Sequence, residues 1–112
     1  QFHQPGRTKD SNMLKHIVMW KFKDHAEGAD KATNLRKAKA LLDACADIAP
    51  GTLRFEVAIA QSGMECTYDL VLYTEFEDRE ALNAYLHHPQ HEALKPFMGA
   101  VRQERQCMDY LA

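Results

Sequence analysis

The chain has 112 residues, which is enough for one small domain and too few for two. Its 14 basic and 16 acidic side chains leave a formal charge of −2, so the charge gives no indication of a nucleic acid or an anionic membrane as partner. The sequence contains no run of about 18 apolar residues, the length needed to span a bilayer, and no apolar core of a signal peptide is evident. We therefore expect a soluble protein that faces a small molecule or another protein.

The three cysteines, Cys45, Cys66 and Cys107, are widely spaced and form no C-x-x-C pair. This pattern predicts neither a disulfide framework nor a zinc site. It is typical of a reducing compartment, so we expect a cytoplasmic protein. The polar residues 1–12 precede Met13, and we expect them to be a flexible N-terminal extension or a cloning remnant, with the domain covering residues 13–112.

The first predicted strand covers residues 14–23, where residue types alternate with a period of two. Both of its faces are apolar at the centre, which indicates that both are covered. One face carries Leu14, His16, Val18, Trp20 and Phe22, and the other carries Lys15, Ile17, Met19 and Lys21. A helix follows a polar loop at residues 24–28, with Asp30 as its N-cap and apolar spacing as far as Ile48, before Ala49-Pro50-Gly51 ends it.

Two more strands are predicted at residues 52–59 and 68–76. Asp78 is expected to cap a helix that ends near Leu86, Pro89 to begin another, and Pro96 to break it. A weaker strand is expected at residues 104–111. The order β-α-β-β-α-β predicts an α+β, ferredoxin-like protomer with an antiparallel sheet. Helices on one face leave the other face bare, and we expect a second copy to cover it in a homodimer.

Three segments together resemble the stress-responsive A/B-barrel family, across Met13 to about Tyr110. They are Lys15-His16-Ile17-Val18 followed by Trp20-Lys21-Phe22-Lys23, then Tyr68-Asp69-Leu70, and the run from Tyr85 to His91 that contains His88-Pro89-Gln90-His91. Asp109-Tyr110 also resembles the closing strand of the family. The resemblance implies a ferredoxin-like protomer that pairs through its sheet into a dimeric α+β barrel, with a cavity between sheet and helices. Most members of the family are known as small stress-associated or uncharacterised proteins.

One plant branch of the family, the olivetolic acid cyclase type, closes a linear polyketide by an aldol reaction. Its catalytic Tyr and His match Tyr85 and His91, and its strand-start His matches His16. An aldol closure needs a base beside a carbonyl and a donor for the enolate oxygen, which a histidine and a tyrosine can supply without a cofactor. The resemblance therefore implies a small hydrophobic or β-keto ligand. The first helix, residues 30–48, lacks the aromatic wall of that branch, which implies a pocket of different shape.

The same residues also have purely structural interpretations. Tyr85 would pack its ring in the core and bond its hydroxyl locally, His88 would cap the helix that Pro89 begins, and His91 would pair with His88. Trp20 would fill the core, or line a pocket such as that of the cofactor-free monooxygenases of the same fold. A metal site at His88, His91 and Glu92 lacks a second group of ligands, so no metal is predicted.

Three functions are compatible with this pattern. The first is a homodimeric A/B-barrel protein with a small-molecule cavity and no assigned activity. The second is a cofactor-independent polyketide cyclase or lyase that uses Tyr85 and His91 as its acid/base pair. The third is a structural stress protein that assembles into larger oligomers. Whether the protein is an enzyme is left open by the sequence.

Overall fold

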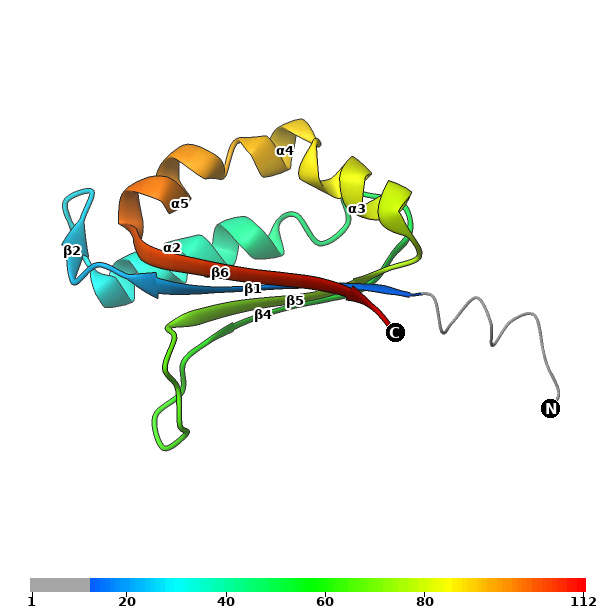
Figure 1. Cartoon of the computed structure of the whole chain (residues 1–112). Helices are drawn as coiled ribbons and strands as arrows, with labels where there is room; N and C mark the ends of the chain where they lie inside the picture. The colour runs from blue at the N-terminus through cyan, green and yellow to red at the C-terminus, as the bar shows by residue number, and fades with distance from the viewer. Residues whose placement is uncertain (1–12) are drawn as a thin grey trace, which may run out of the picture.

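The computed structural model describes residues 13–112; the prediction for residues 1–12 lies outside that range. A four-stranded sheet and the helices that cover one of its faces make up the fold (Figure 1). The elements in chain order are β1 (Leu14–Phe22), β2 (His25–Ala26), β3 (Ala29–Asp30), α2 (Lys31–Asp43), β4 (Thr52–Ile59), β5 (Leu70–Phe76), α3 (Arg79–Leu86), α4 (Pro89–Glu92), α5 (Lys95–Val101) and β6 (Arg102–Leu111).

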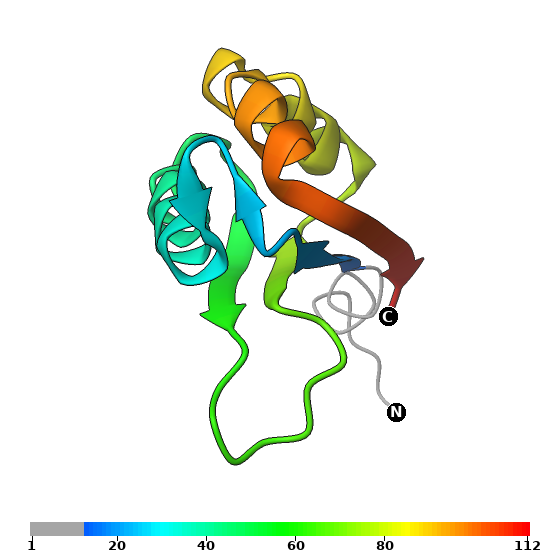
Figure 2. The same ribbon diagram turned by 90° about the vertical axis from the view of Figure 1, so that its left-hand side faces the viewer.

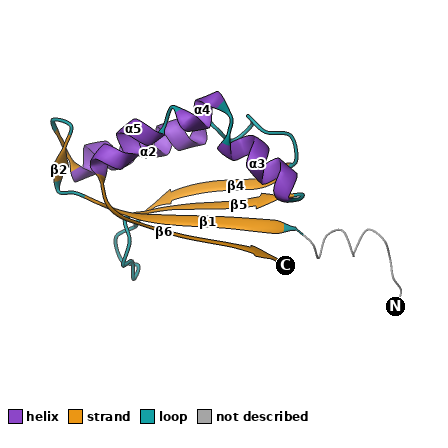
Figure 3. Cartoon of the chain, turned by 45° about the horizontal axis from the view of Figure 1, so that its top comes forward, coloured by secondary structure: helices purple, strands orange, loops and turns teal. Residues whose placement is uncertain are grey.

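The sheet order is β4-β5-β1-β6, and every neighbouring pair is antiparallel. This order, with α2 and the α3–α5 segment on the same side of the sheet, is the predicted ferredoxin-like α+β fold (Figure 3). The fold class is therefore confirmed. Among residues 13–112, no helix is both long enough and apolar enough to cross a membrane.

The structure decides which face of β1 points to the helices. His16, Val18 and Trp20 belong to the buried face, together with Leu14 and Phe22, and they pack under the helices. The alternate residues, such as Ile17 and Met19, lie on the face that the described helices leave uncovered. The face of β1 with His16 is therefore the inner one, a choice that the sequence left open.

The helix-free face carries apolar and aromatic side chains that water contacts in the single chain. Met19 is 37% exposed, Tyr110 37% and Met108 66%. The loop 60–69 between β4 and β5 extends beyond this face, away from the helices (Figure 2). A hollow of about 630 Å³ lies between this loop and the sheet, with Met19, Ala58 and Val71 in its wall.

The predicted helix caps are present. The Asp30 carboxylate accepts a hydrogen bond from the Thr33 amide at 2.9 Å, and the Asp78 carboxylate accepts one from the Ala81 amide at 2.9 Å. The first helix ends at Asp43 and not near Ile48 as predicted, because the chain tightens there into turns. The Cys45 amide donates to the Leu42 carbonyl, three residues back, as in a 3₁₀ turn. The Cys45 side chain is nevertheless buried.

Two prolines divide the second helical region as predicted. Pro89 lies in the first turn of α4 and Pro96 in the first turn of α5. The prediction of a loop at residues 24–28 is wrong in one detail, because β2 lies within it and pairs with β3 just after it. Glu27 and Gly28, with φ of 53° and 74°, turn the chain between them. A glutamate is an unusual residue for such a turn, so residue type alone does not indicate a hairpin there.

Candidate functional site

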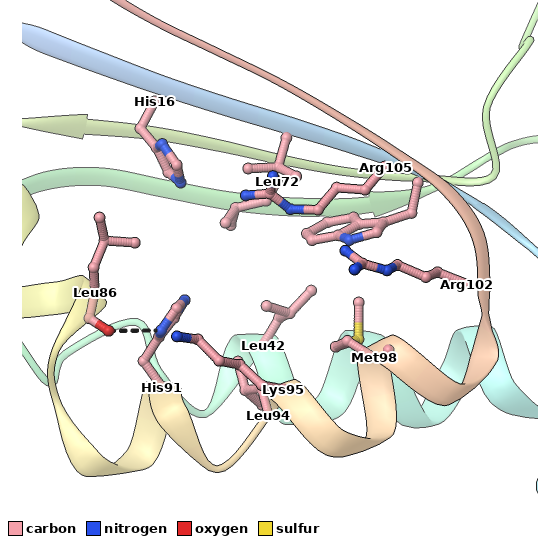
Figure 4. Close-up of a pocket in the computed structure, with 13 residues that line it drawn as sticks. His16, Leu42, Leu72, Leu86, His91, Leu94, Lys95, Met98, Arg102 and Arg105 are labelled. Atoms are coloured by element: carbon pink, nitrogen blue, oxygen red, sulfur yellow. Dashed lines mark hydrogen bonds between the residues drawn. The ribbon is translucent and has the colours of Figure 1, made fainter.

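A cavity of about 320 Å³ lies between the inner face of the sheet and the α3–α5 segment (Figure 4). Its wall is mostly apolar, and two histidines and three basic side chains are its polar groups. The lining residues are Val18, Leu42, Leu72, Leu86, Leu94, Met98 and Gly99, with Trp20, and the polar His16, His91, Lys95, Arg102 and Arg105. A largely apolar cavity with a few convergent polar groups is typical of a small-molecule site.

His91 faces this cavity with one ring nitrogen held by the backbone. Its Nδ1 lies 3.0 Å from the carbonyl oxygen of Leu86, which can only accept, so Nδ1 carries the proton. Leu86 is the last residue of α3, where a helix leaves carbonyls without partners, and the turn at His88-Pro89 brings His91 back to it. The unprotonated Nε2 is therefore on the ring edge away from Leu86 (Figure 4).

Burial lowers the pKa of His91 below its ordinary value of 6.5, since the charged imidazolium is poorly solvated there. The hydrogen bond to Leu86 opposes this effect but is the smaller influence. His91 is consequently a neutral imidazole at neutral pH. An unprotonated nitrogen in an apolar cavity is the form that can accept a proton.

His16 enters the cavity from the opposite wall and is paired with an acid. Its Nδ1 lies 2.5 Å from Oδ1 of Asp109, and the two residues are direct neighbours across β1 and β6. His16 is 3% exposed. Its Nδ1 donates to the Asp109 carboxylate, because a carboxylate can only accept. The Sγ of Cys107 lies 4.0 Å from the same Nδ1, and one ligand atom from each of the three residues lies within 4.8 Å of the others. The hydrogen bond between His16 and Asp109 already occupies two of these atoms.

Tyr85 supports His91 from behind. Its ring centroid is 4.6 Å from that of His91, and it also packs on Phe55 and Phe76 at 5.9 and 5.5 Å. The side chain is fully buried and does not belong to the cavity wall. Among residues 13–112, its hydroxyl has no hydrogen-bond partner, so the expected local bond is not formed. Burial raises the pKa of this phenol.

Residues 14–112 match the sequence model of a protein family, the stress responsive A/B barrel domain. The chain belongs to this family. A dimeric protein of unknown function from Bacteroides fragilis NCTC 9343, with a ferredoxin-like fold, is 27% identical; the match has a TM-score of 0.76 and covers 90% of this chain and 97% of the other. No curated protein matches significantly.

Two further solved structures show the same fold at lower identity. An A/B-barrel family protein from Mesorhizobium loti is 24% identical with a TM-score of 0.63, over 89% of this chain and 96% of its own. A hydroxynitrile lyase from Passiflora edulis is 14% identical with a TM-score of 0.70, over 91% of this chain and 94% of its own.

In this A/B-barrel domain, the structure brings together three of the five residues singled out in the sequence. His16, Trp20 and His91 line the cavity, and Tyr85 touches His91 from outside the wall. His88 caps α4, where its Nδ1 accepts the Gln90 amide at 3.0 Å, and it does not pair with His91.

Sequence reasoning missed Asp109 as the partner of His16, and it missed the basic residues of the cavity. Alternation in the last strand could have placed Asp109 on the inner face. Its partner could not be read from the sequence, because the two residues are 93 positions apart.

Proposed function

We propose that this protein is a homodimeric A/B-barrel protein whose cavity binds a small, mainly apolar molecule and removes a proton next to a carbonyl group. The observation that carries the proposal is the tautomer of His91. Its Nδ1 donates to Leu86, so its Nε2 is free to accept a proton in the cavity. The lowered pKa keeps this nitrogen unprotonated at neutral pH.

In the proposed step, Nε2 of His91 takes the proton, and the electron pair of the C–H bond moves to the carbonyl oxygen to form an enolate. We assign the role of donor to the enolate oxygen to His16, whose ring is held by the Asp109 carboxylate through Nδ1. The enolate can then form or break a carbon–carbon bond, as a cyclase or a lyase does. No cofactor is needed for this chemistry.

Tyr85, the donor predicted from the sequence, is a second candidate for the same task. Its hydroxyl is buried without a partner among the described residues, and such a group usually has a reason to be kept. Its ring contact with His91 puts it next to the proposed base. The motif that Tyr85 and His91 share with the cyclase branch favours a β-keto or polyketide-like substrate.

The Passiflora edulis neighbour is named as a hydroxynitrile lyase. At 14% identity it is evidence only about the fold, and its substrate is not transferred to this chain. It supports the proposal in one respect, because a protein named as a lyase has this fold.

Hydrogen–deuterium exchange at the carbons beside a ketone tests the base. Wild-type protein is incubated with 2-octanone in D2O, and the loss of the methyl and methylene signals is followed by proton NMR. His91→Gln should reduce the catalysed rate by about 100-fold or more, the usual contribution of a positioned base.

His87→Gln is the matched control, because His87 also has its Nδ1 on a backbone carbonyl, at 2.9 Å from Asn83, but is exposed and outside the cavity. This variant should exchange at the wild-type rate. Absence of catalysis by the wild type, or equal rates in wild type and His91→Gln, would contradict the proposed base.

The homodimer is proposed from the helix-free face of the sheet. Its exposed apolar side chains need a cover, and the solved relative from Bacteroides fragilis is described as dimeric. Val71 lies at the centre of that face, between Met19 and Ala58 in the neighbouring strands. A second copy placed there would bury all three.

Light scattering on a sizing column tests this assembly. We expect a dimer for the wild type and a monomer for Val71→Glu, since an unpaired charge would be buried in the contact. Ala84→Glu, which adds the same charge on the exposed side of α3, should stay dimeric. A wild-type monomer at micromolar concentration would refute the dimer, and a larger closed species would favour the structural, oligomer-forming alternative.

A further inference from the structure

The cavity has a positively charged side as well as its histidines. Lys95, Arg102 and Arg105 belong to its wall, and Figure 4 shows the two arginine side chains reaching into it. Among the described residues, no acidic side chain is part of the wall. A site that is otherwise apolar therefore has three cationic groups and, within residues 13–112, no anion of its own in the wall to neutralise them.

An irregularity in β6 puts both arginines on the inner face. Trp20 is opposite Arg105 and Lys21 opposite Glu104, but Phe22 is opposite Arg102, so Gln103 is an extra residue in the ladder. In a regular strand, residues three apart point to opposite faces. If the same residues paired without a bulge, Arg102 would point away from the helices; the bulge at Gln103 returns it to the cavity side beside Arg105.

The ion pairs differ among the three cations. Nζ of Lys95 lies 2.6 Å from Glu92 and already has a carboxylate partner. Neither arginine pairs with a carboxylate of residues 13–112 within 4.0 Å. A guanidinium stays charged at any physiological pH, and its planar set of donors matches the two oxygens of a carboxylate.

We infer that the ligand of this cavity is a small apolar carboxylate, whose acid group binds Arg102 and Arg105 while its apolar body lies along Trp20 and Met98. This inference rests on the proposed function, since it names the class of molecule that the same cavity takes. It places the carboxylate on the basic side and the reactive carbon toward His91. A keto acid satisfies both ends of the site.

Trp20 provides the readout, because it is the only tryptophan of the chain and lines the cavity. Its fluorescence is titrated with straight-chain carboxylates of about four to ten carbons and with the corresponding neutral amides, at low ionic strength so that charge contacts are not screened. The acids should bind at least tenfold more tightly than the amides. The reason is that a neutral amide has neither the negative charge of a carboxylate nor its second accepting oxygen for the guanidinium groups.

The double variant Arg102→Gln, Arg105→Gln should remove this preference, because the acids lose their cationic partners. The double variant Arg36→Gln, Arg79→Gln is the control, because it removes the same two charges from exposed helix positions outside the cavity. It should keep the preference of the wild type. Circular dichroism spectra of both double variants establish that they are folded.

Equal binding of acids and amides by the wild type would overturn the carboxylate inference and leave the cavity proposal standing. The same conclusion would follow if the preference survived in Arg102→Gln, Arg105→Gln. A Trp20 signal that responds to neither series would overturn the small-molecule cavity itself, and the carboxylate inference with it. Failure of the inference and failure of the proposed function therefore give different results.

Discussion

Replacing Tyr85 by Phe should leave the protein at least as stable as the wild type, which is unusual for a change in a fully buried side chain. The ring would keep its packing on Phe55, Phe76 and His91. Only the hydroxyl is removed, and within residues 13–112 it has no hydrogen-bond partner. A buried polar group without a partner costs about 1–3 kcal/mol, so we expect Tyr85→Phe to gain about 1 kcal/mol after the small void is subtracted.

Urea unfolding at one fixed protein concentration measures this difference, since the stability of a dimer depends on the concentration of its protomers. Tyr73→Phe is the matched control, because the Tyr73 hydroxyl donates to the Glu75 carboxylate at 2.6 Å. That variant should lose roughly 0.5–1.5 kcal/mol with its hydrogen bond. If Tyr85→Phe lost about 1 kcal/mol or more, the Tyr85 hydroxyl would have a partner in the folded protein and the reasoning would be refuted.

The same variant decides between the two proposed proton donors. If His16 with Asp109 donates to the enolate oxygen, ketone exchange by Tyr85→Phe should proceed at the wild-type rate, because the ring that supports His91 is still present. A rate reduced by about tenfold or more would assign the donor role to the Tyr85 hydroxyl.

Burial lowers the pKa of His91 below 6.5, so its contribution to stability is present above that pH and lost as the pH falls; His91→Gln should flatten this part of the urea midpoint curve between about pH 7.5 and 4.5. The catalysed exchange rate should likewise decline as the pH falls below 6.5, and a rate that rises toward low pH would exclude His91 as the base. Gly51→Ala should destabilise the fold by about 2 kcal/mol or more in urea unfolding, since φ is +87° and the new Cβ would lie 2.8 Å from the Cβ of Ala81. Gly63→Ala has a similar φ of +86° with open space around it, and a loss as large as that of Gly51→Ala would contradict the steric argument.

The sequence predicted the strands well because each has a clear period of two, and it predicted the helix starts because Asp30 and Asp78 are strong N-caps. It left the two faces of β1 undecided, since both are apolar at the centre. The choice depends on where the helices pack, and only the assembled sheet shows that His16 and Trp20 lie beneath them.

Part of the site could also be predicted. His91 and Tyr85 flank a proline turn, and that local geometry brings their rings into contact. The pairing of His16 with Asp109 depends on the register between the first and last strands, which no local pattern encodes. The basic side of the cavity was missed for a related reason, because simple alternation assigns Arg102 and Arg105 to opposite faces.

The extra residue in β6 makes the length of this strand adjustable at one place. Deleting Gln103 would turn the bulge into a regular ladder, and Arg102, Arg105 and Asp109 would all keep their sides of the sheet. Deleting Gln106 instead would move every later residue by one position, so that Tyr110 replaced Asp109 beside His16. Length variation among natural relatives should therefore be tolerated at the start of β6 and be rare in its second half.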